Sequence, residues 1–270
     1  LTNASDPALA QASESLDVAI PDRIDVIEEM VADGDIVGIV FRTKGTHLGN
    51  LYGIPATSKS IDIQGTAFFW LADGKITQSW ILADEAALLK QLNLWLPERS
   101  DGKQTAPPQL LDVRDGNEVL AEIKAAPEDN QTYLNKFKVS AYKSANPPEG
   151  LLPEGRPYEI YTRSGFNHMG KRAEELGVGE QSAGQAFPDR RDQVALVIAE
   201  GDQVMIAFRL TGTNTQNFYG TPPTNARTEV WEVGLQGFEG DHWKTGWWLG
   251  DEIGMMLKIG APQEFLIPGS

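Results

Sequence analysis

Two aspartates of this sequence stand at matching places where acid–base chemistry is possible. Asp84 and Asp251 each follow a strand-like segment and precede a glutamate and an apolar helical pattern. An aspartate in this position either takes part in proton transfer or caps the helix by accepting hydrogen bonds from free backbone amides. Capping is the role we expect for both, and a catalytic role is the alternative.

Three further positions carry groups suited to proton transfer or to polar contacts. His47 follows Gly45-Thr46 at a strand end and could polarise a carbonyl group or relay a proton; an exposed histidine at a loop edge is the alternative. Gln64 and Glu232 are expected at equivalent positions of a long strand. If they point inward, Glu232 is a buried carboxylate beside Trp231, a setting that raises the pKa of an acid. An outward-facing polar side chain is the alternative.

Aromatic and amide side chains could bind a flat, apolar ligand. Two tyrosines lie in loops rich in Gly and Pro that could form a pocket rim, and strand tryptophans could line the pocket. Packing of the same rings in the core is the alternative. The candidate substrate-binding residues are Tyr52, Gln64, Trp80, Tyr219, Trp231 and Trp247. Arg42 and Arg209, at matching strand positions, could bind a carboxylate, but surface cross-strand ion pairs are expected.

The composition excludes several classes of protein. The 270 residues include 38 acidic and 23 basic ones, and the net charge of −15 disfavours nucleic acid as a partner. The chain has no cysteine, and its three histidines lack metal-ligand spacing, so we expect neither a metal nor a cofactor. No apolar run approaches the roughly 20 residues of a membrane span. A cytoplasmic location is the prediction, with a periplasmic or secreted one left open.

The chain repeats itself at an offset of about 167 residues, with about 22 of roughly 73 aligned positions identical. Ile20-Pro21-Asp22-Arg23 returns as Phe187-Pro188-Asp189-Arg190, and the two aspartates are expected to shape the strand entrance. The loop Asn50–Pro55 returns at 217–222. These matches are far more numerous than chance allows, and they indicate a tandem duplication.

Each copy predicts the same series of elements. In the first copy, residues 23–32, 36–46, 60–71 and 75–83 are expected to be strands, and residues 85–92 a helix. Asp33-Gly34 and Asp73-Gly74 are expected to form tight hairpin turns, because glycine accepts a positive φ. Before the second meander we expect an amphipathic helix over 129–145, a short strand over 158–162 and a helix over 167–176; before the first, only a helix over 7–16.

The predicted fold is α+β, with two tandem cone-shaped domains, each a curved antiparallel sheet packed on helices. Residues 1–96 are assigned to the first domain, which lacks a long helix that the second has. Residues 97–110 are assigned to a polar, proline-containing linker, and residues 111–262 to the second domain.

Several motifs resemble those of one known family. Ala32-Asp33-Gly34-Asp35-Ile36-Val37, Gly45-Thr46-His47-Leu48-Gly49 and Gly53-Ile54-Pro55-Ala56-Thr57 are similar to segments of the SnoaL-like polyketide (ester) cyclases, which belong to the nuclear transport factor-like superfamily. The resemblance implies an α+β cone in which a pocket carboxylate acts on a carbon acid next to a carbonyl group, without metal or cofactor. It also implies pairing sheet to sheet, so that the duplication would form an internal pseudo-dimer, with a homodimer possible as well.

Three functions follow as hypotheses. The first is a cofactor-independent enzyme of cyclase, isomerase or lyase type that acts by general acid–base chemistry on a hydrophobic carbonyl compound. In that case the first copy is the expected active site, because it keeps His47 and the closer family match. The second is a binding protein for a small apolar ligand, and the third is a scaffold with filled cones.

Overall fold

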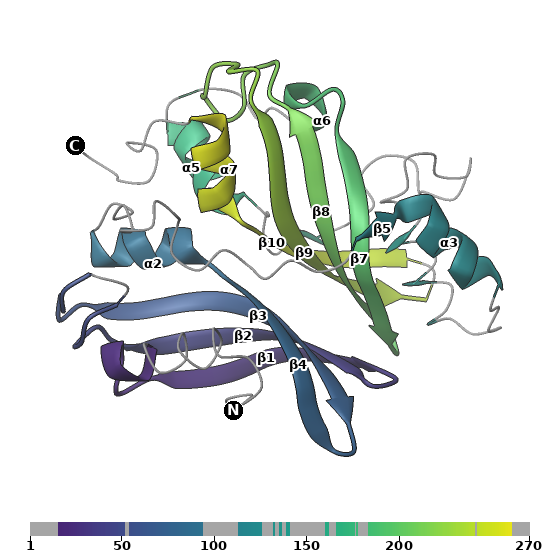
Figure 1. The fold of residues 1–270 in the computed structure, drawn as a ribbon, viewed down its shortest axis with the longest axis horizontal. Coiled ribbons are helices and arrows are strands. Elements are labelled where there is room, and N and C mark those ends of the chain that lie inside the picture. Colours follow the sequence, from purple (N-terminus) through teal and green to yellow (C-terminus); the bar gives the residue numbers. More distant parts are fainter. Residues whose placement is uncertain are drawn as a thin grey trace. The chain divides into compact units, whose positions relative to one another are not determined.

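The computed structural model describes residues 16–51, 54–93, 113–125, 132, 135–136, 139–140, 160–161, 166–175, 177, 183–240 and 242–260. The predicted linker, most of the predicted helix over 7–16 and Tyr52 lie outside these residues. The chain divides into two compact units, the first built mainly from the elements before the linker and the second mainly from those after it (Figure 1). Among the described residues, no helix has the length and apolar character needed to cross a membrane.

The first unit is a meander of four strands followed by a helix, as predicted. Its strands pair in the order β1-β2-β3-β4. The elements are β1 (Ile24–Asp33), β2 (Ile36–Thr46), β3 (Ser60–Ala72), β4 (Lys75–Ala83) and α2 (Glu85–Leu92). Each boundary lies within one residue of the predicted one, because hairpin turns and a helix cap mark the element ends.

The hairpin turns have the backbone geometry that their sequences indicate. Asp73 and Gly74 have φ values of 51° and 70°, and Gly34 has a φ of 59°. Positive φ at both central residues is the geometry whose twist matches that of the flanking strands. The Asp73-Gly74 turn is therefore confirmed. In the first hairpin the positive φ of Gly34 is confirmed, but the turn lies at Gly34-Asp35, because Asp33 still belongs to β1.

The second unit repeats the meander and adds helices and two short strands. Its sheet has the order β5-β7-β8-β9-β10-β6. The elements are β5 (Arg114–Asp115), α3 (Gly116–Ala125), β6 (Ile160–Tyr161), α5 (Asn167–Glu175), α6 (Ala183–Ala186), β7 (Arg191–Glu200), β8 (Gln203–Thr213), β9 (Arg227–Glu239), β10 (His242–Gly250) and α7 (Glu252–Ile259). The expected short strand and the expected helix over 167–176 are confirmed as β6 and α5.

The duplication is visible in individual hydrogen bonds. Asp22 accepts bonds from the amide and the hydroxyl of Thr46 at 2.7 and 2.8 Å, and Asp189 accepts the same pair from Thr213 at 2.6 and 2.8 Å. The backbone amides, followed by the hydroxyls, lower the pKa of both carboxyl groups. The two aspartates thus join the start of the first long strand to the end of the second in each copy.

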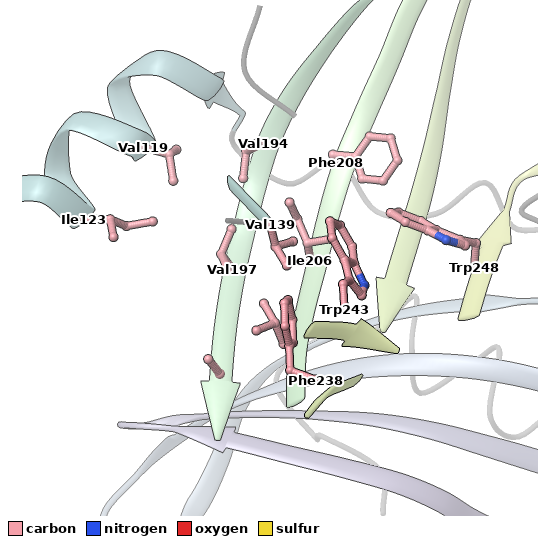
Figure 2. Packing of buried hydrophobic residues seen from close by; sticks show 12 residues of the cluster. Val119, Ile123, Val139, Val194, Val197, Ile206, Phe208, Phe238, Trp243 and Trp248 are labelled. Carbon is pink, nitrogen blue, oxygen red and sulfur yellow. The ribbon is translucent and has the colours of Figure 1, made fainter. Parts of the chain in front are cut away.

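One core cluster of the second unit lies on the side of the sheet that packs against α3. Residues of the other side, such as Met205 and Val233, are buried as well. Val119 and Ile123 of α3 point toward Val194 and Val197 of β7, as Figure 2 shows. Val139, in the predicted helix over 129–145, belongs to the same cluster. The described residues of that segment are helical, and three of them are fully buried: Asn135, Val139 and Ser140. Core packing of this helix is therefore confirmed where it is described.

Candidate functional site

The strand pairing of β9 decides which of its side chains share the core of the second unit. Successive residues of a strand point to opposite faces. Phe208, Ile206 and Val204, all members of the core cluster, are the register partners of Glu232, Gly234 and Gln236. We call the side of the sheet that carries these residues and packs against α3 the inner face.

Glu232 is a buried carboxylate of the inner face, as one of the two alternatives predicted. It lies between Phe208 of β8 and Gly250 of β10, and its exposed fraction is only 7%. Trp231, its neighbour in sequence, projects to the opposite side of β9. The carboxylate is therefore placed among apolar residues by its strand position and not by the adjacent tryptophan.

The expected equivalence of Gln64 and Glu232 is wrong. Gln64 pairs with Arg42 across the sheet, and the residue that pairs with the matching Arg209 is Trp231. The Asp84 amide donates to the Gln64 carbonyl, as the Asp251 amide donates to the Trp231 carbonyl, both at 2.9 Å. The counterpart of Glu232 is Gly65, which pairs with Phe41 as Glu232 pairs with Phe208.

Gln64 belongs to a polar network of the first unit. Its amide donates to Glu28 at 2.6 Å. Arg42 pairs with Glu28 and, at 2.8 Å, with Asp62, and the guanidinium lowers the pKa of the Asp62 carboxyl group. Arg209 likewise pairs with Glu229 at 2.8 Å. The expected cross-strand ion pairs of both arginines are confirmed.

Asp84 and Asp251 cap the two matching helices. Asp84 accepts a hydrogen bond from the Ala87 amide at 2.9 Å, and Asp251 accepts one from the Gly254 amide at 2.7 Å. Burial raises the pKa of Asp251, with partial opposition from the Gly254 amide and from Lys258. The capping role is confirmed for both aspartates, while a catalytic role stays a prediction.

His47 is fully buried, so the alternative of an exposed loop-edge histidine is wrong. Its Nδ1 atom lies 3.0 Å from the Thr57 hydroxyl. Burial lowers its pKa, and a contact with the Gly49 backbone partly opposes this shift. The ring therefore favours the neutral form and lies across the base of its loop.

The predicted ligand-binding aromatic residues are scattered. Trp80 is fully buried beside Phe68, with ring centres 6.0 Å apart. Tyr219 packs on Phe218 at 4.6 Å. Trp247, like Trp231, projects away from the inner face, because its register partner is Leu235 and not Gly234 or Gln236. Trp231 and Trp247 thus lie on the other side of the sheet from Glu232.

Other aromatic rings occupy the inner face. Trp248 meets Phe208 edge to face at 5.9 Å, and Trp243 stacks on Phe238 at 5.5 Å (Figure 2). Such pairs bury large apolar area in fixed orientations. The neighbouring residues Trp247 and Trp248 of β10 thus point to opposite faces of the sheet.

Gln236 is the inner-face residue that the sequence analysis missed. Its side chain has no exposed surface, and neither amide atom has a hydrogen-bond partner among the described residues. A Cβ atom added to Gly234 would overlap both the Gln236 amide nitrogen and the Trp248 ring. The amide therefore folds back over Gly234, in the direction of Glu232. The period-two spacing of Glu232, Gly234 and Gln236 was the signal available in the sequence.

A buried carboxylate and a histidine also meet within the second unit. Glu252 accepts a hydrogen bond from the Met169 amide at 2.8 Å and lies 3.9 Å from Nε2 of His168. Carboxylate and imidazole groups are both metal ligands. The sequence spacing did not indicate this contact, and the absence of a metal stays a prediction.

Each unit is thus an α+β arrangement, an antiparallel meander combined with helices. The family model of the SnoaL-like polyketide cyclases matches residues 3–92 and 178–259, more than half of the chain. The chain belongs to this family, and its two matched segments correspond to the two copies. Among curated proteins, none matches this chain.

Solved structures resemble parts of the chain. A SnoaL-like polyketide cyclase-type protein from Jannaschia sp. CCS1 is 21% identical over 51% of this chain and 99% of its own, with a TM-score of 0.38. TsrD from Streptomyces laurentii is 23% identical over 33% of this chain and 63% of its own, with a TM-score of 0.29. A SnoaL-like polyketide cyclase from Agrobacterium tumefaciens C58 is 21% identical over 31% of this chain and 68% of its own, with a TM-score of 0.28.

Proposed function

We propose that the second unit is a cofactor-independent enzyme that acts by general acid–base chemistry on a hydrophobic, carbonyl-containing small molecule. The observation that carries this proposal is the burial of Glu232 on an otherwise largely apolar inner face. A carboxylate with few water neighbours is a stronger base than one in bulk solvent.

The proposed step is enolisation. The Glu232 carboxylate removes a proton from the carbon next to the carbonyl group, and the C–H electron pair moves to form an enolate. The protonated Glu232 then returns its proton to the enolate oxygen or, in a conjugated enolate, to a different carbon, which gives isomerisation. Alternatively the enolate carbon attacks a second carbonyl group, which closes a ring, and the alkoxide formed takes the proton from Glu232. The flanking rings of Phe208 and Trp248 would hold the apolar part of the substrate.

The choice of the second unit differs from the expectation based on His47. The first unit has Gly65 at the position of Glu232, so its inner face lacks this carboxylate. His47 in turn corresponds to Asn214, which is also fully buried and bonded within its loop. These contacts support a structural role for His47.

The test uses 2-tetralone, a flat ketone with exchangeable protons next to its carbonyl group. Its deuterium uptake in D2O near neutral pD is followed by NMR for the wild type and two variants. We expect the wild type to accelerate exchange over buffer and Glu232→Gln to lose about 10²–10⁴-fold of that rate.

Glu229→Gln is the matched control, because Glu229 lies on the same strand but faces the opposite side and pairs with Arg209. It should keep the wild-type rate. Exchange by the wild type that does not exceed the buffer rate, or equal rates for the wild type and Glu232→Gln, would contradict the proposal.

A non-catalytic binding protein is the second candidate. The stacked and edge-to-face ring pairs of the inner face favour it. Binding of 2-tetralone without any enhancement of exchange would select this candidate. For either function we also propose that the two copies form an internal pseudo-dimer within one chain, with a homodimer as the next level of assembly.

A further inference from the structure

The amide of Gln236 is a buried polar group whose hydrogen-bonding capacity is unused. Both Oε1 and Nε2 lack partners among the described residues, and the side chain has no exposed surface. A buried amide without hydrogen bonds costs free energy, which is why most buried polar groups in proteins are paired. The side chain is thus retained at a cost to stability, as is common for groups that serve a ligand.

The surroundings of the amide give it a fixed direction. Gly234 provides the space in which the amide and the Trp248 ring lie, since a Cβ atom there would overlap both. Gln236 and Glu232 are four residues apart on one strand face, a Cα separation of about 13 Å. With the amide folded toward Glu232, the two polar groups lie at the two ends of one stretch of the inner face.

The first unit lacks this feature. Phe69 pairs with Val37 on β2 as Gln236 pairs with Val204 on β8, so the counterpart of the amide is an apolar ring. Glu232 and Gln236 therefore distinguish the second copy at two positions of the same strand face. Because both residues occur only in the second copy, the amide belongs with the carboxylate and is not needed for the fold that both copies share.

We propose that Gln236 binds a neutral, flat ligand that presents a carbonyl oxygen next to a hydroxyl or N–H group. Nε2 would donate to the carbonyl oxygen, and Oε1 would accept from the adjacent hydroxyl or N–H. An anionic ligand is disfavoured, because the Glu232 carboxylate shares the face. The inference rests on the proposed function for the location of the site and names the substrate chemistry of that site.

Direct binding of a matched pair of probes tests the proposal. 2-Quinolinone is neutral and flat, and it carries a carbonyl group next to an N–H group; N-methyl-2-quinolinone keeps the shape and loses the donor. Calorimetry with the full chain should show at least about tenfold weaker binding of the N-methyl compound, the equivalent of one lost hydrogen bond in a buried site.

Gln236→Met keeps the length of the side chain and removes both polar atoms. We expect this variant to lose the preference between the two probes and to show a melting temperature that is unchanged or up to about 2–4 °C higher, because the unpaired amide is gone. If the amide instead bonds only an ordered water molecule, the wild type shows no preference and Gln236→Met melts at a lower temperature, which overturns the proposal.

Two other results overturn it as well: a wild type that binds neither probe, and a Gln236→Met protein that keeps the wild-type preference. Glu232-dependent deuterium exchange is a separate readout. A protein that exchanges 2-tetralone protons through Glu232 but ignores the N–H group of the probe would refute the role of Gln236 and leave the proposed reaction intact.

Discussion

His47 and Asn214 are different residues that fill one structural role in the two copies. Asn214 Oδ1 accepts from the Thr224 amide at 3.0 Å, and its Nδ2 donates to the Gln216 carbonyl at 2.9 Å. His47 Nδ1 meets Thr57, the counterpart of Thr224, at 3.0 Å. Each side chain thus contacts the far end of its loop and adds to the backbone hydrogen bonds that join the two loop ends.

Exchange of the histidine for its counterpart tests this equivalence. We expect His47→Asn to change the free energy of unfolding by about 1 kcal/mol or less at pH 8, because Asn214 shows that an asparagine can make the loop contacts. The sign of the pH dependence follows from the lowered pKa of His47. The unfolded chain binds a proton near pH 6.5 and the folded chain only at lower pH, so the wild type loses stability as the pH falls below about 6.5.

Denaturant unfolding between pH 8 and pH 5 measures both effects. His47→Asn should lose less stability than the wild type over this range. His242→Asn is the control for the loss of one imidazole, because His242 is exposed at a strand end. Equal pH dependence of the wild type and His47→Asn would show that the imidazole does not resist protonation.

At the scale of elements, the pairing of β9 with β10 places large and small residues opposite each other. Gly234 lies opposite Trp248, and at the matching place in the first unit Ala67 lies opposite Ile81. The larger side chain, that of Trp248, is therefore paired with glycine, and the smaller Ile81 is paired with alanine. The two copies thus distribute side-chain volume differently at this pair of matching positions.

A double-mutant cycle measures this coupling. Gly234→Ala alone should cost about 1–3 kcal/mol of stability, because its Cβ atom meets the Trp248 ring and the Gln236 amide. Combined with Trp248→Ile, the same change reproduces the pair found in the first unit and should cost less than the sum of the single variants, by about 0.5–3 kcal/mol. Strict additivity in urea unfolding would show that the two positions do not share space.

At the scale of the whole molecule, duplication has allowed the two copies to diverge while the fold is kept. The strand-entrance aspartates and the helix caps recur in both units, whereas Glu232 and Gln236 are found in the second alone. Residues that hold the fold are thus shared, whereas the carboxylate and the amide proposed to act on a ligand are not. A single active unit per chain is the expected outcome.

The oligomeric state tests the pseudo-dimer. If the two copies supply both halves of a pair, the 29.5 kDa chain has little need of further association. We expect light scattering to give a mass no larger than that of a dimer of this chain at micromolar concentration. A tetramer or larger assembly would contradict an internal pair.

Much of the fold was determined by the sequence alone, because the signals that mark it are local. Turn residues such as Asp73-Gly74 set the hairpins, and an aspartate before an apolar helical pattern set each helix start, so both units could be predicted to within a residue or two over the meanders. The repeat and the family resemblance were likewise present in the order of the residues.

The tertiary structure decided which side chains meet. Alternation along a strand shows that Trp231 and Glu232 face opposite ways, but not which of them faces the helices. That choice depends on α3 and on β8, which are distant in sequence, so the period-two spacing of Glu232, Gly234 and Gln236 could not by itself show which face they share. The reason is physical: period and turns are properties of neighbouring residues, whereas the inside of a sheet exists only once another element covers it.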